Sequence, residues 1–158
     1  MKRSQLNQTF IYIMAILVVG TILLIGYRSI SSIFDQGCDV ERSRFLADLE
    51  DSLRRNTNFG FAQSLQVRAP CDYEEICFVD AEAENLNDSP HSIIQQEVSD
   101  GTGYTVFLIR RGIVEPVMQN SNIKVDNDEG FVCIESLTGR FSFNLEGVGR
   151  GRVGVSSD

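Results

Sequence analysis

The stretch from Thr9 to Tyr27 contains nineteen consecutive residues and no charge. At about 1.5 Å of rise per residue, a helix of this length spans about 28 Å, close to the hydrocarbon thickness of a bilayer. A soluble domain has no reason to build so long an uninterrupted apolar helix. The sequence therefore predicts a transmembrane helix over residues 9–27 that anchors the chain in a lipid bilayer.

Charge near this span predicts its orientation. Lys2 and Arg3 lie in the tail of residues 1–8, and basic residues favour the cytoplasmic side. Arg28 flanks the other end and partly opposes this bias. All 22 acidic residues follow the span, with all basic residues except Lys2 and Arg3. We expect a single-pass protein of the cell membrane, with the N-terminus in the cytoplasm and the C-terminal domain outside. The negative charge of this domain argues against nucleic acid as a partner.

The cysteines agree with this orientation, since all of them follow the span: Cys38, Cys71, Cys77 and Cys133. An even number suits two disulfides in an oxidising compartment. The short spacing favours a Cys71–Cys77 pair, which leaves Cys38 to join Cys133, although four cysteines permit two other pairings. A zinc site is disfavoured because the only close pair has five residues between its members, more than zinc motifs usually have.

A secretory signal peptide is the alternative for residues 1–28. Its apolar region usually has about 7–15 residues and ends in a small-x-small cleavage site. Here the run is longer and ends in Gly26-Tyr27-Arg28, which lacks the small residues of such a site. The pattern favours an anchor that remains on the protein.

The first residues, Met1-Lys2-Arg3-Ser4-Gln5-Leu6, place basic residues, a small residue and a glutamine directly before the apolar run. This arrangement resembles the class III signal peptides of archaeal type IV pilins and related surface proteins. The resemblance implies cleavage between Ser4 and Gln5, with the apolar helix kept on the mature chain. Thr9 would then be the fifth mature residue, where bacterial pilins carry a glutamate. An uncleaved signal anchor is the alternative.

Residues 28–56 read as an amphipathic helix that continues from the span. Gly37 and Asp39 predict a break or a kink, and Asp39 is a candidate N-cap for a second segment. Arg54 and Arg55 close this segment, where a helix C-terminus favours cations. Its apolar residues recur at helical spacing: Phe45, Leu46, Leu49 and Leu53.

Residues 57–158 predict a β-rich head. Residues 104–109 and 113–118 read as a hairpin, as do residues 131–137 and 141–145. Pro116 indicates an edge strand or a bulge, and the glycine-rich tail reads as an edge strand or a frayed end. The sequence thus predicts an α+β fold: a long N-terminal helix, transmembrane in its first half, packed on a small antiparallel β-sheet head. This plan also resembles that of pilins.

Asp126 and Asp128 precede Gly130 in a segment that could wrap a calcium ion with carboxylate oxygens. An EF-hand loop would need a glutamate at its twelfth position, where this chain has Leu137. An acidic β-turn without an ion is the simpler interpretation, so calcium is the only cofactor that the sequence raises, and it does so weakly.

No group of residues in the sequence predicts catalysis. Asp88, Ser89 and His91 crowd one segment, but triad residues must converge from separate elements, and such clusters chiefly form loops. The acidic pairs and runs are expected to be solvated: Glu74, Glu75, Asp80, Glu82 and Glu84. Asn87 begins an Asn-Asp-Ser glycosylation sequon, followed by Pro90, which weakens it.

The sequence therefore favours a structural protein over an enzyme. We expect a single-span, pilin-like surface subunit, or a minor component of a filament or secretion assembly, whose partners are the bilayer and copies of itself or other pilin-like subunits. The alternative is a membrane-tethered binding module that captures a ligand outside the cell and does not polymerise.

Overall fold

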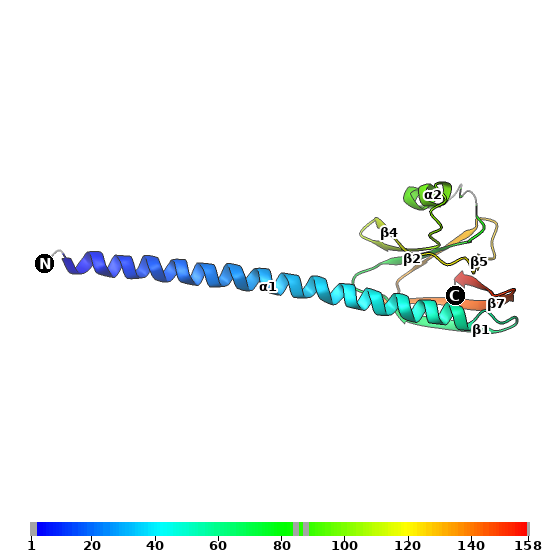
Figure 1. Ribbon diagram of the computed structural model, residues 1–158, viewed down its shortest axis with the longest axis horizontal. Helices are drawn as coiled ribbons and strands as arrows, with labels where there is room; N and C mark the ends of the chain where they lie inside the picture. The colour runs from blue at the N-terminus through cyan, green and yellow to red at the C-terminus, as the bar shows by residue number, and fades with distance from the viewer. Residues whose placement is uncertain (1–2, 84–85, 87–88, 158) are drawn as a thin grey trace. The chain divides into compact units, whose positions relative to one another are not determined.

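The computed structural model describes residues 3–83, 86 and 89–157 of the 158-residue chain (Figure 1). The side chains of residues 3–9 and 29–36 are outside this description. The chain divides into two compact units, residues 1–40 and residues 41–158. The first helix contributes to both units, and all strands belong to the second, which we call the head.

Helix α1 covers Arg3–Arg55. The predicted break at Gly37 is wrong, because the helix continues through this residue and Asp39 lies inside it rather than at its N-cap. A glycine in an exposed helix interior costs only about 1 kcal/mol relative to alanine, which is too little to end a helix with good helix formers on both sides. The end of α1 is as predicted, with Arg54 and Arg55 in its last turn.

The head has two four-stranded sheets, which confirms the α+β class but corrects the expectation of one small antiparallel sheet. The first sheet has the order β1 (Ala62–Arg68), β7 (Arg140–Gly149), β8 (Arg152–Ser157), β5 (Ile123–Val125). The second has the order β4 (Ile113–Met118), β3 (Val106–Arg110), β2 (Glu75–Val79), β6 (Phe131–Glu135). Neighbouring strands are antiparallel except β5 and β8, which are parallel.

The first predicted hairpin is confirmed. Strands β3 and β4 pair antiparallel around a turn at Arg111 and Gly112, both of which have positive φ. Pro116 lies on β4, at the edge of its sheet, next to a register shift between the pairs of Val106 and Phe107. An edge position and a bulge both accommodate the missing amide hydrogen of proline.

The second predicted hairpin is wrong. A tight turn does join residues 137 and 140, but β6 continues into the second sheet and β7 into the first. The chain therefore crosses between sheets at Thr138 and Gly139. The glycine-rich tail is also corrected, because it forms the interior strand β8, with Val153 and Val155 buried.

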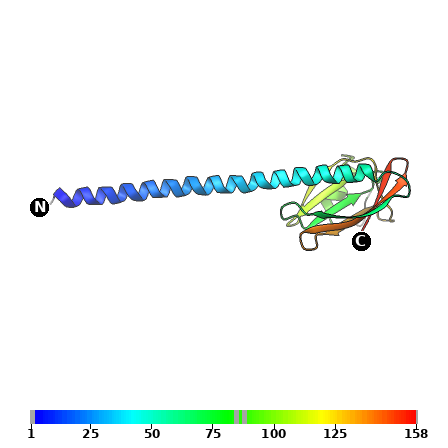
Figure 2. The same ribbon diagram turned by 90° about the horizontal axis from the view of Figure 1, so that it is seen from below.

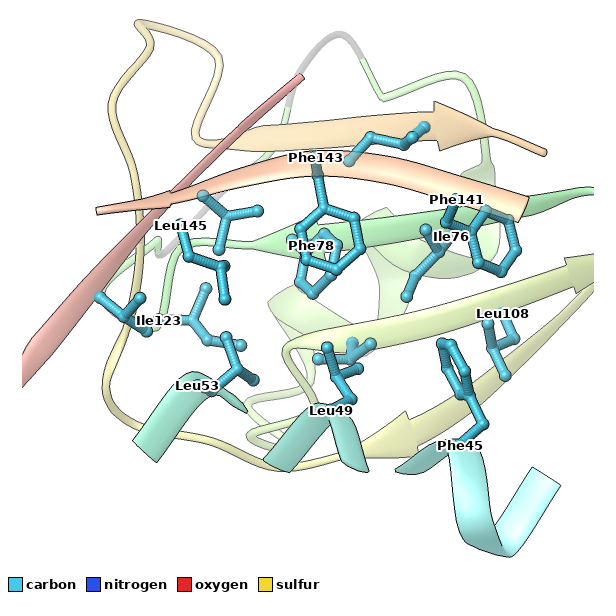
Figure 3. Packing of buried hydrophobic residues seen from close by; sticks show 14 of the residues in the cluster. Phe45, Leu49, Leu53, Ile76, Phe78, Leu108, Ile123, Phe141, Phe143 and Leu145 are labelled. Atoms are coloured by element: carbon cyan, nitrogen blue, oxygen red, sulfur yellow. The ribbon is translucent and has the colours of Figure 1, made fainter. Parts of the chain in front are cut away.

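The main core draws side chains from both sheets and from α1 (Figure 3). The rings of Phe78 on β2 and Phe143 on β7 lie 5.2 Å apart at their centroids. Alternate residues of β7 are buried, as the period of two predicts. The predicted apolar side of α1 is confirmed at three residues that belong to this core: Phe45, Leu49 and Leu53.

A helix that the sequence did not indicate, α2 (Ser92–Ser99), covers a second core. Its Ile94 is fully buried with Phe107 of β3 and Cys77 of β2. On the other face of this sheet, Ile76 and Phe78 of β2 belong to the main core. The second sheet is thus covered on both faces.

Candidate functional site

The apolar surface of the N-terminal unit is the first candidate for function. Residues Phe10–Arg28 have a mean hydropathy of 2.5 and are long enough to cross a membrane. Every large apolar side chain from Phe10 to Tyr27 is exposed. The hydroxyl of Thr21 donates to the carbonyl of Val18 at 2.8 Å, so this polar group is satisfied within the helix. Such a surface needs lipid or other protein around it.

The residues of the predicted processing site, Ser4 and Gln5, lie within α1, and their side chains are outside the described part. The predicted sequon residue Asn87 also lies outside the described residues, as does Asp88.

A disulfide joins Cys77 on β2 to Cys133 on β6, and the two residues are direct partners in the sheet register. The predicted Cys71–Cys77 pairing is therefore wrong. Cys71 lies before β2, and the extended strand carries Cys77 away from it at about 3.3 Å per residue. Cys38 and Cys71 are also disulfide-bonded, and no cysteine of the described residues is free.

The disulfide is adjacent to the sole histidine. Nε2 of His91 lies 2.8 Å from Oε2 of Glu75, and both side chains are about one-fifth exposed. Potential ligand atoms of Glu75, Cys77 and His91 lie within 4.8 Å of one another, the one cluster of this kind in the described part of the chain. Since the metal ligand is a thiolate and Cys77 is oxidised, the cluster offers too few ligands for a zinc site.

The segment around His91 does not form a catalytic triad in the described residues. Oγ of Ser89 contacts the backbone nitrogen and carbonyl of His91, each at 3.4 Å, rather than its ring. The partner of Nε2 of His91 is a carboxylate oxygen of Glu75 rather than a hydroxyl that the imidazole could activate. The contact between His91 and Glu75 joins the start of α2 to strand β2.

The acidic side chains that resemble catalytic pairs are bound to the fold instead. Glu74 accepts from the backbone nitrogen of Arg111, and Asp80 accepts from two backbone nitrogens, those of Glu82 and Val125. Glu82 forms a bidentate pair with Arg152. Glu84 lies outside the described residues.

Asp126 and Asp128, the predicted calcium ligands, are exposed in the loop between β5 and β6. The side chain of Asn127 organises this loop, because it donates to the carbonyl of Phe131 and accepts from the nitrogen of Gly130, each at 2.8 Å. Two exposed carboxylates fall short of the six to eight oxygens that calcium requires. The oxygen atoms that this loop offers therefore fit a polar turn better than a calcium site.

A partly exposed polar network that the sequence did not reveal surrounds the buried Tyr73. The hydroxyl of Tyr73 donates to Oε2 of Glu115 at 2.7 Å, and Arg42 of α1 reaches the same oxygen at 3.1 Å. Arg110 lies over the Tyr73 ring, 5.3 Å from its centroid. Burial raises the pKa of Tyr73 above its ordinary value, and the hydrogen bond to Glu115 raises it further. Residues so far apart in sequence leave no local pattern.

The head also has an acidic pocket of about 540 Å³ beside this network. Its lining includes the carboxylates of Asp72, Glu74, Glu75 and Glu135. No family model, curated protein or solved structure matches the chain.

Proposed function

We propose that this chain is a single-span membrane protein whose head lies outside the cytoplasm and that it acts as a pilin-like structural subunit. The observation that carries the proposal is the fully exposed apolar segment Phe10–Arg28 at the start of α1, the helix that also supplies side chains to the core of the head. A membrane span that continues as the spine of a β-rich domain is the plan that the N-terminal resemblance implies.

In this proposal the apolar segment has two successive uses. It holds the subunit in the bilayer, and it packs against the same segment of other copies when they assemble. The part of α1 that carries Phe45, Leu49 and Leu53 stays docked on the sheets and transmits force between anchor and head. The disulfides support an oxidising location for the head, because bonds of this kind form and persist in such compartments.

Intact mass measurement and N-terminal sequencing of the protein from its own membrane test this proposal. Cleavage of the type implied by the resemblance gives a mature chain that begins at Gln5. We expect that start, a mass lower by four hydrogens than that of the reduced chain, and filaments that contain the chain. A mature protein that retains Met1 or Lys2 and never assembles would contradict the subunit function.

The acidic pocket favours a second candidate function, a tethered module that binds a small cationic ligand. The carboxylates that line the pocket supply negative charge at a concave site. Isothermal titration of the detergent-solubilised chain with spermidine tests this candidate. Binding that is lost in Glu135→Gln supports it, and no heat of binding contradicts it.

A further inference from the structure

One end of the head exposes aromatic side chains. We call this region the aromatic tip: residues 56–61, which follow α1, and residues 147–151, which join β7 to β8. Phe59 is 86% exposed, Phe61 is 50% exposed and Val148 is 37% exposed. Both views of the ribbon place the β7–β8 turn beside the end of α1 (Figure 2). Aromatic side chains are enriched in protein interfaces.

The aromatic tip is a built structure. The nitrogen of Gly60 donates to the carbonyl of Gly147 at 3.1 Å, and the nitrogen of Gly147 donates to the carbonyl of Phe61 at 2.7 Å. A Cβ atom on Gly147 would lie only 1.8 Å from the carbonyl oxygen of Asn58, so only glycine permits this approach. A Cβ on Gly149 would lie 3.4 Å from the ring of Phe59, which places that ring against the turn.

The aromatic tip contains one charged residue, Arg150, in a chain with a net charge of −8. With its flanks, residues 51–64 and 146–157, it contains four arginines and two acidic residues, Asp51 and Glu146. Three of these arginines are engaged, Arg54 and Arg55 with Asp51 and Arg152 with Glu82. Arg150 is exposed and makes no ion pair with any residue that the structure describes. It is the cation that the aromatic tip offers to a partner.

An acidic surface lies at the other end of β8. Asp126, Asp128 and Glu129 are exposed and take part in no ion pair within the described ranges. Because β5 runs parallel to β8, the loop that follows Val125 lies toward Ser157, whereas the aromatic tip precedes Arg152. The two surfaces of one head therefore lie at opposite ends of a strand.

We propose that the aromatic tip of one copy docks on the acidic loop, residues 126–129, of a second copy. Phe59 and Phe61 would supply the apolar contact, and Arg150 would pair with Asp126 or Asp128. A contact between two different surfaces is heterologous and repeats from copy to copy, so it builds a row of heads rather than a closed pair. This inference rests on the proposed subunit function and adds to it the head contact that holds neighbours in register.

Photo-crosslinking of the full chain in its membrane tests the proposal. Benzoylphenylalanine replaces Phe59 in one sample and Leu23, an exposed residue of the apolar segment, in another. We expect position 59 to crosslink to the peptide of a second copy that contains residues 126–129. Arg150→Glu and the pair Asp126→Arg with Asp128→Arg should each lower this yield about tenfold, the scale for loss of a central interface contact. Mixing the two variants should restore it.

Arg140→Glu is the matched control, because Arg140 is also exposed but lies at the turn between β6 and β7. It should leave the yield unchanged. Crosslinks at position 23 without any at position 59 would overturn the head contact and leave the subunit function standing. An absence of crosslinks between copies at both positions would overturn both proposals. Crosslinks from position 59 to a different protein, or equal losses in Arg140→Glu, would also overturn the head contact.

Discussion

The ring of Phe45 on α1 meets the ring of Phe141 on β7 edge to face, with centroids 6.0 Å apart and planes inclined by 61°. Both side chains are buried in the main core, where Leu49 and Leu53 follow Phe45 at helical spacing (Figure 3). These three residues, near the end of α1, therefore belong to the same hydrophobic cluster as Phe141. The first prediction tests this contact.

Phe45→Ala should lower the free energy of unfolding of the head by about 3–5 kcal/mol, because it removes a buried ring and leaves a cavity. Urea unfolding of the detergent-solubilised chain, followed by circular dichroism, measures the loss. Leu137→Ala is the matched control, since Leu137 is 70% exposed, and it should change stability by less than about 0.5 kcal/mol. Equal effects of the two substitutions would show that the helix does not share the core.

Cys133→Ser should lower stability by about 4 kcal/mol in the chain-entropy account, because the Cys77–Cys133 bond closes a loop with a sequence separation of 56. Proteolytic mapping of the oxidised protein should find the peptide of Cys77 bonded to that of Cys133. A Cys71–Cys77 peptide in the native protein would contradict the pairing. Thermal unfolding with and without a reductant provides the comparison.

Stability should fall as the pH rises above about 10, through the Tyr73–Glu115 contact. The folded pKa of Tyr73 is raised above its ordinary value of about 10. Between the unfolded and the folded pKa the folded chain binds more protons than the unfolded chain, so stability falls as the pH rises through this interval. Tyr73→Phe should flatten this part of the pH profile, and at neutral pH it should cost about 0.5–1.5 kcal/mol for the lost hydrogen bond. A profile unchanged by the substitution would contradict the assignment.

Gly147→Ala should loosen the aromatic tip, since its Cβ would overlap the carbonyl of Asn58. Overpacking of this kind costs about 1–3 kcal/mol. Hydrogen exchange should increase at Gly60, whose nitrogen bonds to the carbonyl of Gly147. Gly37→Ala is the control, because nothing lies within 4 Å of a Cβ there and the residue is helical. It should leave exchange at Gly60 unchanged.

Leu17→Arg should release the chain from the membrane, because an arginine at the centre of a span costs about 2.5–3.5 kcal/mol on insertion scales. Alkaline carbonate extraction measures this release. Ser43→Arg, which places the same charge in α1 beyond the apolar segment, should leave the chain in the membrane pellet. Equal extraction of both variants would contradict a membrane span at residues 10–28.

Patterns within single elements were predictable, and pairings between elements were not. The alternation through Phe141, Phe143 and Leu145 predicted a half-buried strand, and the helical spacing of Leu49 and Leu53 predicted a buried side of α1. The period of two does not identify the neighbouring strand, so β6 and β7 looked like a hairpin although they join different sheets.

The same limit applies to the polar contacts. Tyr73 and Glu115 are separated by 42 residues, and only the folded sheets bring them together. The tail was predicted to be an edge strand or a frayed end because it is rich in glycine. The alternation of Val153 and Val155 was the signal that would have identified β8 as a buried strand. Helix α2 has only eight residues, and such a length gives little periodicity to detect.

The pairing of β1 with β7 has a consequence for the order of folding. It joins residues 62–68 to residues 140–146, so the first sheet closes only after the chain has been synthesised through residue 146. Until then, Phe45 and Leu49 lack the β7 side chains that share their core. Contacts between segments so distant in sequence form slowly. During that interval the apolar side chains of this part of α1 are open to solvent, where they favour aggregation.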